Sequence, residues 1–234
     1  MNNSLVFVVT GTRKGIGYEI AKYYLDRGNV VYGCSRGESS ISHEKYFHYS
    51  LDVSDEKKVV SMLRDCIKNH KKIDVLINNA GIASMNHLIL TSLSSVKNIM
   101  TTNFIGTFLF LRETAKCMMR NNSGRIINFS TVAVPLNLEG EAIYASSKAA
   151  IETLTKISAK ELANYNITIN TIGPAPVLTD LIKVVPKAKI DVLIKNQAIK
   201  KFAQFEDVIN VINFYISKDS NLITGQTIYL GGVN

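Results

Sequence analysis

Short apolar runs alternate with amphipathic segments along the chain. Runs rich in β-branched residues predict strands at residues 5–9, 30–35, 46–53, 73–77, 124–129, 167–172 and 227–230. Apolar residues at helical spacing predict helices from the first glycine-rich turn to about residue 27, and at 55–70, 94–120, 143–165 and 206–216. Strands that alternate with helices imply an α/β fold with a parallel sheet, whose ligand crevice lies beyond the carboxyl ends of the strands.

The composition fits a single domain over residues 1–234, because 46% of residues are hydrophobic and 20% are charged. Residues 178–201 predict one or two short helices that form a variable wall over the substrate. We find no apolar run of about 18 residues and no signal peptide, so we expect a cytoplasmic protein without a membrane segment. Three cysteines, Cys34, Cys66 and Cys117, have no metal-like spacing, so we expect reduced thiols in the core and no metal site.

The formal net charge of +8 raises the possibility of a nucleic-acid binder. The lysines are spread along the chain, however, and no aromatic residues interleave a basic stripe. We therefore expect no nucleic-acid partner and a solvated basic surface that attracts anionic substrates.

A glycine-rich turn with Gly11, Gly15 and Gly17 joins the first predicted strand to the first helix. Glycines let a backbone turn tightly and approach a pyrophosphate, while the positive helix end binds its charge. Three residues separate the first two glycines, unlike the G-x-G-x-x-G dinucleotide fingerprint. In its strand-to-helix context we interpret the turn as a phosphate cradle.

The second predicted strand decides the choice of dinucleotide. Where NAD-binding folds carry an acidic residue for the ribose hydroxyls, this chain has Cys34 or Ser35, followed by Arg36. With Lys14 from the glycine turn, two cations flank a 2′-phosphate, so we predict NADP(H) rather than NAD(H). Two alternatives stay open. Glu38 could accept hydrogen bonds from the ribose hydroxyls after a small shift of the loop, or Lys14 and Arg36 could be solvated charges on loops that bind no phosphate.

Two further motifs follow predicted strands. Asp52-Val53 is placed to bracket an adenine ring, although Asp52 can equally cap the helix that begins near Asp55. Asn79-Ala80-Gly81 lets the backbone pass close to a ribose, with an Asn-rich turn as the alternative. Each motif lies at the carboxyl end of a strand, where a parallel sheet binds its ligands.

Tyr144 and Lys148 are i and i+4 neighbours on one helical face. A cation beside a phenol favours the phenolate and so lowers its pKa, which would make tyrosine a better acid-base group. The alternative is an ordinary helix that presents both side chains to water. Pattern alone leaves Asn103, midway along the helix at 94–120, facing water as well.

In combination and in order, these motifs resemble the short-chain dehydrogenase/reductase family in its compact form, over essentially the whole chain. The matching residues are Thr10-Gly11, Gly15-Ile16-Gly17, Asp52-Val53, Asn78-Asn79-Ala80-Gly81, Asn103, Tyr144, Lys148, Pro174, Thr179 and Thr224-Gly225-Gln226. The resemblance implies a three-layer, doubly wound Rossmann-type parallel sheet of about seven strands. It also implies a homo-oligomer, tetramer or dimer, that assembles through the helices holding Asn103 and Tyr144.

The resemblance assigns roles by position. Tyr144 would be the general acid-base residue, Lys148 would lower its pKa and hold the nicotinamide ribose, and Asn103 would position a water that relays protons to Lys148. Val177 and Thr179 would hold the carboxamide. The expected cofactor-binding residues are Gly11, Arg13, Lys14, Gly15, Ile16, Gly17, Ser35, Arg36, Asp52, Val53, Asn79, Ala80, Gly81, Tyr144, Lys148, Pro174, Val177 and Thr179.

Two departures from the family pattern stand out. The usual catalytic serine, thirteen residues before the tyrosine, is replaced by Thr131, and Ser130 precedes it. Successive strand residues point to opposite faces, so only one hydroxyl can reach the substrate; we expect Thr131, with slowed or narrowed chemistry. Ala175 replaces a common glycine after Pro174, which questions the shape of this loop because alanine tolerates positive φ poorly.

The resulting hypothesis is reversible reduction of a carbonyl to an alcohol by hydride from NADPH. The substrate would be a small molecule or carrier-bound, and a 3-oxoacyl thioester on an acidic acyl carrier protein would suit the basic surface; relatives also act on sugars, steroids and small ketones. One alternative is a cofactor-binding regulator or scaffold with weak or no catalysis, suggested by Thr131 and Ala175. The longer sugar-nucleotide epimerases are disfavoured by chain length and glycine spacing.

Overall fold

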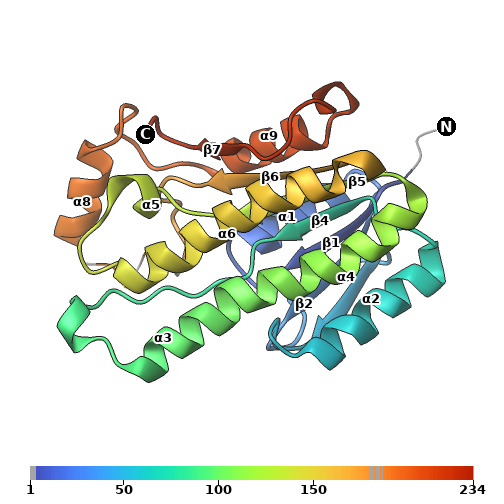
Figure 1. Ribbon diagram of the computed structural model, residues 1–234, viewed down its shortest axis with the longest axis horizontal. Coiled ribbons are helices and arrows are strands. Elements are labelled where there is room, and N and C mark those ends of the chain that lie inside the picture. The colour runs from blue at the N-terminus through green and yellow to red at the C-terminus, as the bar shows by residue number, and fades with distance from the viewer. Residues whose placement is uncertain (1–3, 180–181, 183–184, 186, 234) are drawn as a thin grey trace.

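A computed structural model describes residues 4–179, 182, 185 and 187–233, which form a parallel sheet between two layers of helices (Figure 1). The strands are β1 (Val6–Thr10), β2 (Val30–Ser35), β3 (Tyr46–Ser50), β4 (Val75–Asn78), β5 (Gly124–Phe129), β6 (Ile167–Gly173) and β7 (Thr227–Tyr229). Their order is β3-β2-β1-β4-β5-β6-β7, and all six pairings are parallel. The predicted doubly wound α/β fold is confirmed.

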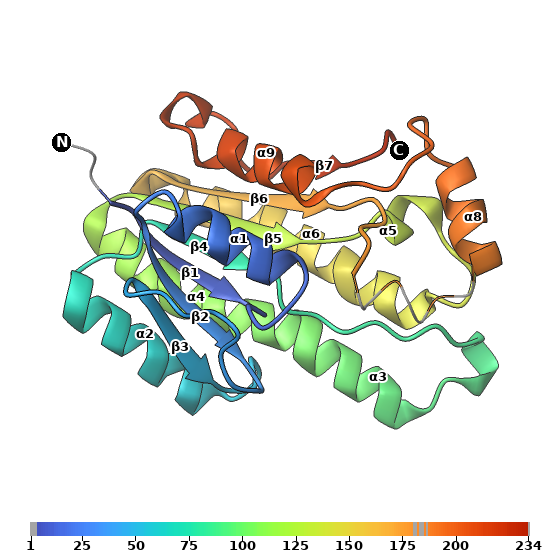
Figure 2. The same ribbon diagram turned by 180° about the vertical axis from the view of Figure 1, so that it is seen from behind.

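Helices cover both faces of the sheet. On one face lie α1 (Ile16–Leu25) and α9 (Phe205–Ile216), in front in Figure 2. On the other lie α2 (Glu56–His70), α4 (Gly106–Asn121) and α6 (Ala142–Leu162), in front in Figure 1. The remaining elements are α3 (Leu93–Met100), α5 (Ala133–Leu136), α8 (Lys187–Lys195), η1 (Leu88–Leu90), η2 (Thr101–Ile105), η3 (Ala163–Tyr165) and η4 (Lys218–Ser220). None of the helices described is both long and apolar enough to cross a membrane.

The central strands are apolar on both faces because each face is covered. In β1, Val6 and Val8 pack into the core shared with α2 and α4, whereas Phe7 and Val9 pack into the core shared with α1 and α9. Burying such a side chain stabilises the fold by about 1.5–3 kcal/mol. Cys34, Cys66 and Cys117 are buried in the first core as free thiols, as predicted.

The third strand is shorter than predicted and ends at Ser50 instead of residue 53. Asp52 Oδ1 accepts a hydrogen bond from the Ser54 amide at 2.9 Å, which turns the chain away from the sheet. Asp55 caps α2, since its carboxylate accepts from the Lys58 amide at 3.2 Å. The alternative that Asp52 caps this helix is therefore wrong.

The helix predicted over residues 94–120 is divided into α3 and α4 by η2, a π-helical turn at Thr101–Ile105. Apolar periodicity does not distinguish one wider turn from a continuous α-helix, so the sequence pattern missed it. Such turns often occur at functional sites because they displace a side chain from its α-helical position. Here the turn carries Asn103.

Candidate active site

Two cavities lie at the carboxyl ends of the strands, with volumes of about 520 and 460 Å³. Both are lined by Ile16, Asn79, Gly81 and Thr179, so they adjoin. Predicted residues around the smaller cavity also include Gly11, Arg13, Lys14, Gly15, Ser35, Arg36, Asp52, Val53 and Ala80. Predicted residues around the larger cavity also include Thr131, Tyr144, Lys148, Pro174 and Val177. Gly17 and Asn103 are in neither lining.

The glycine-rich turn packs closely against neighbouring parts of the chain, where side chains would not fit. Gly11 has a φ of 77°, and a β-carbon there would lie 2.9 Å from Asn79 Nδ2. Gly15, with a φ of 64°, precedes α1 and offers no side-chain cap, so the first helix amides can bind an anion. At Gly17 a β-carbon would lie 2.3 Å from the Gly11 carbonyl oxygen, so this glycine packs the helix against the turn.

The outer part of the smaller cavity is bordered by cations. Arg13, Lys14 and Arg36 are all exposed at its lining, and the Arg13 guanidinium lies over Gly37. Glu38 is exposed and is not in this lining. The arrangement therefore offers positive charge at the end of β2.

Asp52 is the carboxylate in the described lining of this cavity. Burial by itself would raise the pKa of Asp52, but hydrogen bonds from Ser54 and the positive charge of Arg36 outweigh it and hold the pKa below its ordinary value. Asp52 is therefore an anion near neutral pH.

The segment after β4 is tied to the end of β1. Asn79 Nδ2 donates to the Thr10 carbonyl and the Ala80 amide donates to Thr10 Oγ1, both at 2.9 Å. At Gly81 a β-carbon would lie 3.3 Å from both Asn103 Oδ1 and Lys148 Nζ. The backbone thus passes between the two cavities against residues of two helices.

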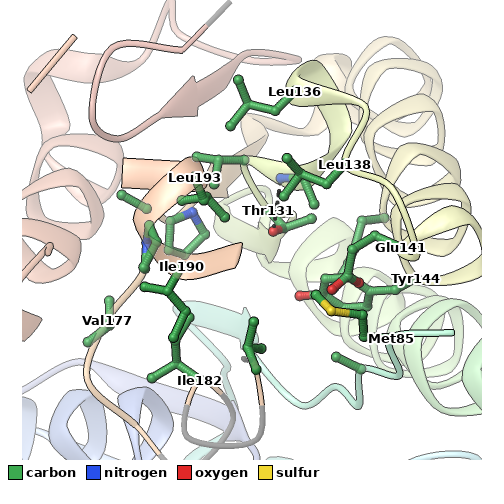
Figure 3. Close-up of a pocket in the computed structure, with 18 of the residues that line it drawn as sticks. Met85, Thr131, Leu136, Leu138, Glu141, Tyr144, Val177, Ile182, Ile190 and Leu193 are labelled. Atoms are coloured by element: carbon green, nitrogen blue, oxygen red, sulfur yellow. Dashed lines mark hydrogen bonds between the residues drawn. The ribbon is translucent and has the colours of Figure 1, made fainter. Parts of the chain in front are cut away.

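Tyr144 borders the larger cavity, one helical turn before Lys148 (Figure 3). Burial raises the pKa of Tyr144 to about 12; a hydrogen bond with the Thr131 side chain opposes this rise, and the Glu141 carboxylate adds to it. Tyr144 is therefore a neutral phenol near neutral pH. We expected Lys148 to lower this pKa, and that expectation is wrong for this structure because burial dominates.

Lys148 is almost fully buried, at 4% exposed. Burial lowers the pKa of Lys148 to about 8, because an ammonium loses hydration in an apolar setting. Its Nζ donates to the Phe129 carbonyl oxygen at 2.8 Å, at the end of β5. The side chain is thus held between the end of the strand and the loop at Gly81.

The two hydroxyls after β5 point to different surroundings. Ser130 is buried, and its hydroxyl donates to Glu152 Oε1, which also accepts from the Tyr229 hydroxyl at 2.6 Å. The Thr131 side chain lies beside the Tyr144 side chain, and the Thr131 Oγ1 accepts a hydrogen bond from the Ala133 amide at 3.2 Å. Thr131 is therefore the hydroxyl beside the phenol.

Asn103 is fully buried, so the pattern-based expectation that it faces water is wrong. Its Oδ1 accepts from the Ile82 amide at 2.8 Å, and its Nδ2 donates to the Ile82 carbonyl at 2.9 Å and to Ser147 Oγ at 3.0 Å. These bonds connect the loop after β4 to α6. The π-helical turn is the reason that an Asn on this long helix points inward.

The loop after β6 closes the cleft opposite α1. Thr179 lies beside the glycine turn, since a β-carbon at Gly15 would be 3.5 Å from its Cγ2. Ala175 is buried and is not among the residues with positive φ, so alanine fits here without strain. Of the predicted wall at 178–201, residues 180, 181, 183, 184 and 186 lie outside the described residues. The rest includes α8 and lines the larger cavity with Ile182, Val185, Lys189, Ile190, Val192 and Leu193.

Two carboxylates near the site, Glu141 and Glu152, were not predicted from the sequence. Glu152 follows Lys148 by four residues and accepts the two buried hydroxyl bonds described above. Glu141 precedes Tyr144 by three residues and lines the larger cavity. Helical spacing from the tyrosine and lysine is the signal that could have found them.

Comparison with known proteins agrees with this geometry. The model of a family described as enoyl-(acyl carrier protein) reductase matches residues 11–234. The chain is 30% identical to the 3-oxoacyl-(acyl-carrier-protein) reductase FabG of Staphylococcus epidermidis, covering 99% of this chain and 98% of the relative. It is 28% identical to the FabG of Vibrio cholerae, covering 97% and 96%.

Solved structures are similar over nearly their whole length. ElxO with NADP bound has a TM-score of 0.89 at 29% identity, covering 97% of each chain. A Tyr-to-Phe variant of ElxO with NADPH bound has a TM-score of 0.88 at 29% identity, covering 97% of this chain and 96% of that one. The ligand-free aldohexose dehydrogenase of Thermoplasma acidophilum has a TM-score of 0.88 at 26% identity, covering 98% and 93%. Sheet, cavities and relatives together show that this chain is an NAD(P)-dependent oxidoreductase of the short-chain dehydrogenase/reductase family.

Proposed function

We propose that the protein reversibly reduces a carbonyl to an alcohol with NADPH, with Tyr144 as the acid that protonates the oxygen. The observation that carries the proposal is that Tyr144 and Thr131 line the larger cavity together with Lys148, beside a second cavity bordered by the glycine-rich turn. A screen of NADPH oxidation with 3-oxoacyl thioesters, keto-sugars and simple ketones tests it. Tight NADPH binding without turnover across the screen would favour the alternative of a cofactor-binding regulator.

The residues of the smaller cavity fit a dinucleotide with a 2′-phosphate. The glycines allow the tight turn before α1, and the amides at the start of α1 suit a pyrophosphate. Arg13, Lys14 and Arg36 suit the 2′-phosphate, and the solved NADP and NADPH complexes of ElxO support this choice. Bound there, the cofactor would supply the hydride. Val177 and Thr179 border the nicotinamide end in this proposal.

The proposed chemistry of the chain concerns the substrate oxygen. Thr131 and Tyr144 donate hydrogen bonds to this oxygen as negative charge grows on it, and Tyr144 then gives up its proton. A pKa of about 12 keeps Tyr144 protonated near neutral pH, which is the form that reduction needs. Lys148, with a pKa of about 8, can pass on a proton near working pH, and Asn103 fixes the loop that borders it.

Thr131 variants test which hydroxyl acts. Thr131→Ser should retain or raise kcat, because it keeps the hydroxyl and removes a methyl group. Thr131→Val should lower kcat by about 10- to 100-fold, since it keeps the shape but loses the hydrogen bond to the developing charge. Steady-state kinetics with NADPH measure both. Ser130→Ala is the matched control, and if it proves the more damaging change, Ser130 is the reacting hydroxyl.

Arg36→Glu tests the preference for NADPH. A charge-assisted bond to phosphate contributes about 1.5–3 kcal/mol, so the dissociation constant for NADPH should rise by about 10- to 100-fold while that for NADH changes little. Fluorescence titration measures both constants. Arg27→Glu makes the same charge change at the far end of α1 and should leave them unchanged. Equal affinities for NADPH and NADH in the parent protein would refute the preference.

For the substrate, we propose a carbonyl compound with an apolar body, of which a 3-oxoacyl thioester is one candidate. The larger cavity is lined mainly by apolar side chains, and FabG relatives are named for 3-oxoacyl thioesters on acyl carrier protein. The net charge of +8 also suits an acidic carrier.

We also propose that the chain assembles as a homo-oligomer through the helices that hold Asn103 and Tyr144. Three large apolar side chains are exposed there: Ile105 at 41%, Phe108 at 37% and Ile157 at 52%. Apolar side chains left exposed on η2, α4 and α6 are consistent with burial against a second copy.

A further inference from the structure

One carboxylate that lines the larger cavity is buried without a hydrogen bond from any described residue. Glu141 is 7% exposed, and its Oε2 is fully buried and accepts no hydrogen bond within the part of the chain that the structure describes. The residue precedes α6, where a side chain often caps the helix, but it makes no such bond. A buried polar atom without a hydrogen bond destabilises the fold, and such atoms are rare in native proteins. Among the described residues, Glu141 is the carboxylate with such an atom, and it lines the larger cavity.

Among the described residues, Lys189 is the cation that acts on Glu141, and it does not form an ion pair with the carboxylate. Lys189 contributes a favourable charge to Glu141, but burial dominates and raises the pKa of the carboxyl. The Lys189 ammonium lies over Gly140, where a β-carbon would be 3.4 Å away, and its side chain is exposed. Among the described residues, no ion pair joins Lys189 to Glu141.

The Glu141 carboxyl lies in the wall of the larger cavity, which is the proposed substrate cavity. Figure 3 shows Glu141 beside Tyr144 and Met85, with Ile182 and Ile190 across the cavity. Glu141 and Tyr144 are three residues apart at the start of α6, so their side chains share a face. A group that bonds Glu141 would thus lie near the carbonyl that Tyr144 protonates.

We propose that Glu141 selects substrates that carry a hydrogen-bond donor, a hydroxyl or a protonated amine, on an apolar body near the reacting carbonyl. The inference rests on the proposed carbonyl reduction and narrows its substrate class. A buried acceptor left unpaired penalises an analogue that lacks the donor, and sites of this kind discriminate far more strongly than apolar pockets do.

Matched ketones test the inference. The probes are cyclohexanones that carry, at the third or fourth ring carbon, either a hydroxyl or a methyl group, and either a dimethylamino or an isopropyl group. Within each pair the shapes are close, and only the donor differs. The parent protein should show a kcat/KM at least about 10-fold higher for the donor member of one pair, measured by NADPH oxidation.

Variants identify the acceptor and the kind of donor. Glu141→Leu should bring the ratio within each pair close to one. Glu141→Gln keeps an accepting oxygen without charge, so it should keep a hydroxyl preference but lose an ammonium preference. Glu161→Gln removes the same charge from an exposed site at the far end of α6, outside the lining of the larger cavity, and should leave both ratios unchanged.

The inference is overturned if the parent protein shows no preference for the donor-bearing ketones. It is also overturned if Glu141→Leu keeps that preference. The inference is also overturned if a 3-oxoacyl thioester is the best substrate of the parent protein and Glu141→Leu reduces it equally well. That result would still support carbonyl reduction. If no ketone or thioester is reduced, the proposed function fails; calorimetric binding of the paired alcohols with NADP⁺ present then decides the inference separately. If the ratio of affinities within each alcohol pair is the same for the parent protein and for Glu141→Leu, the inference about Glu141 is overturned.

Discussion

Tyr144→Phe should lower kcat by about 10²- to 10⁴-fold, the usual contribution of a positioned acid. The change removes the only part of the side chain that can give up a proton, and it keeps the ring that packs at the cavity wall. It also frees Thr131 from its hydrogen bond with the phenol. The dissociation constant for NADPH should change little, because the hydroxyl is proposed to act on the substrate. Single-turnover kinetics and fluorescence titration measure the two quantities.

Tyr165→Phe is the matched control, since Tyr165 lies in η3 directly after the same helix and is exposed. It should leave kcat unchanged. Turnover by Tyr144→Phe at the parent rate would show that another group supplies the proton. In that case the hydrogen bond between Thr131 and Tyr144 would have only a structural role.

Lys148→Met should abolish most activity and yet stabilise the fold at pH 7. A change in pKa from 10.5 to about 8 on burial corresponds to about 3 kcal/mol of destabilisation by the ammonium. Methionine has a similar length and carries no charge, but the Phe129 carbonyl loses a donor, which costs about 1 kcal/mol. The free energy of unfolding should therefore rise by about 2 kcal/mol, measured by urea denaturation.

The rise in the free energy of unfolding caused by Lys148→Met should become smaller as the pH rises. Below pH 8 both the folded and the unfolded chain hold the Lys148 proton, so the parent protein bears the full penalty. Between about pH 8 and 10.5 the folded chain has released the proton and the unfolded chain still holds it, so stability of the parent rises with pH. Lys156→Met, at an exposed site on α6, should show no such pH-dependent difference. Destabilisation by Lys148→Met at pH 7 would show that the bond to Phe129 outweighs burial.

Local patterns were sufficient for the strands and for the glycine turn, because both depend on short-range properties. A strand buried on both faces is mostly apolar, and a tight turn with φ near 70° favours glycine, as at Gly11 and Gly15. The carboxyl ends of parallel strands meet at one edge, so the order of motifs along the chain already placed them together.

Pattern reasoning failed where a side chain has partners far away in sequence. Asn103 looked like a solvent-facing residue until η2 and Ile82 showed it buried. The pKa of Tyr144 was expected to fall because of Lys148, but it rises, since burial depends on the walls that other elements supply. The Tyr144 phenol loses hydration because several elements of the fold surround it. The i and i+4 spacing of residues on one helix gives no information about those elements.

By itself, the sequence determined the α/β class, the glycine-rich turn and the residues at the strand ends, because these follow from periodicity and backbone freedom. Only the tertiary structure decided that Thr131 rather than Ser130 lies beside Tyr144, that alanine fits at Ala175, and that the buried Glu141 carboxylate has no hydrogen bond from a described residue. The physical reason is that hydrogen-bond partners and desolvation are properties of neighbours in space, and most of these neighbours lie on other elements.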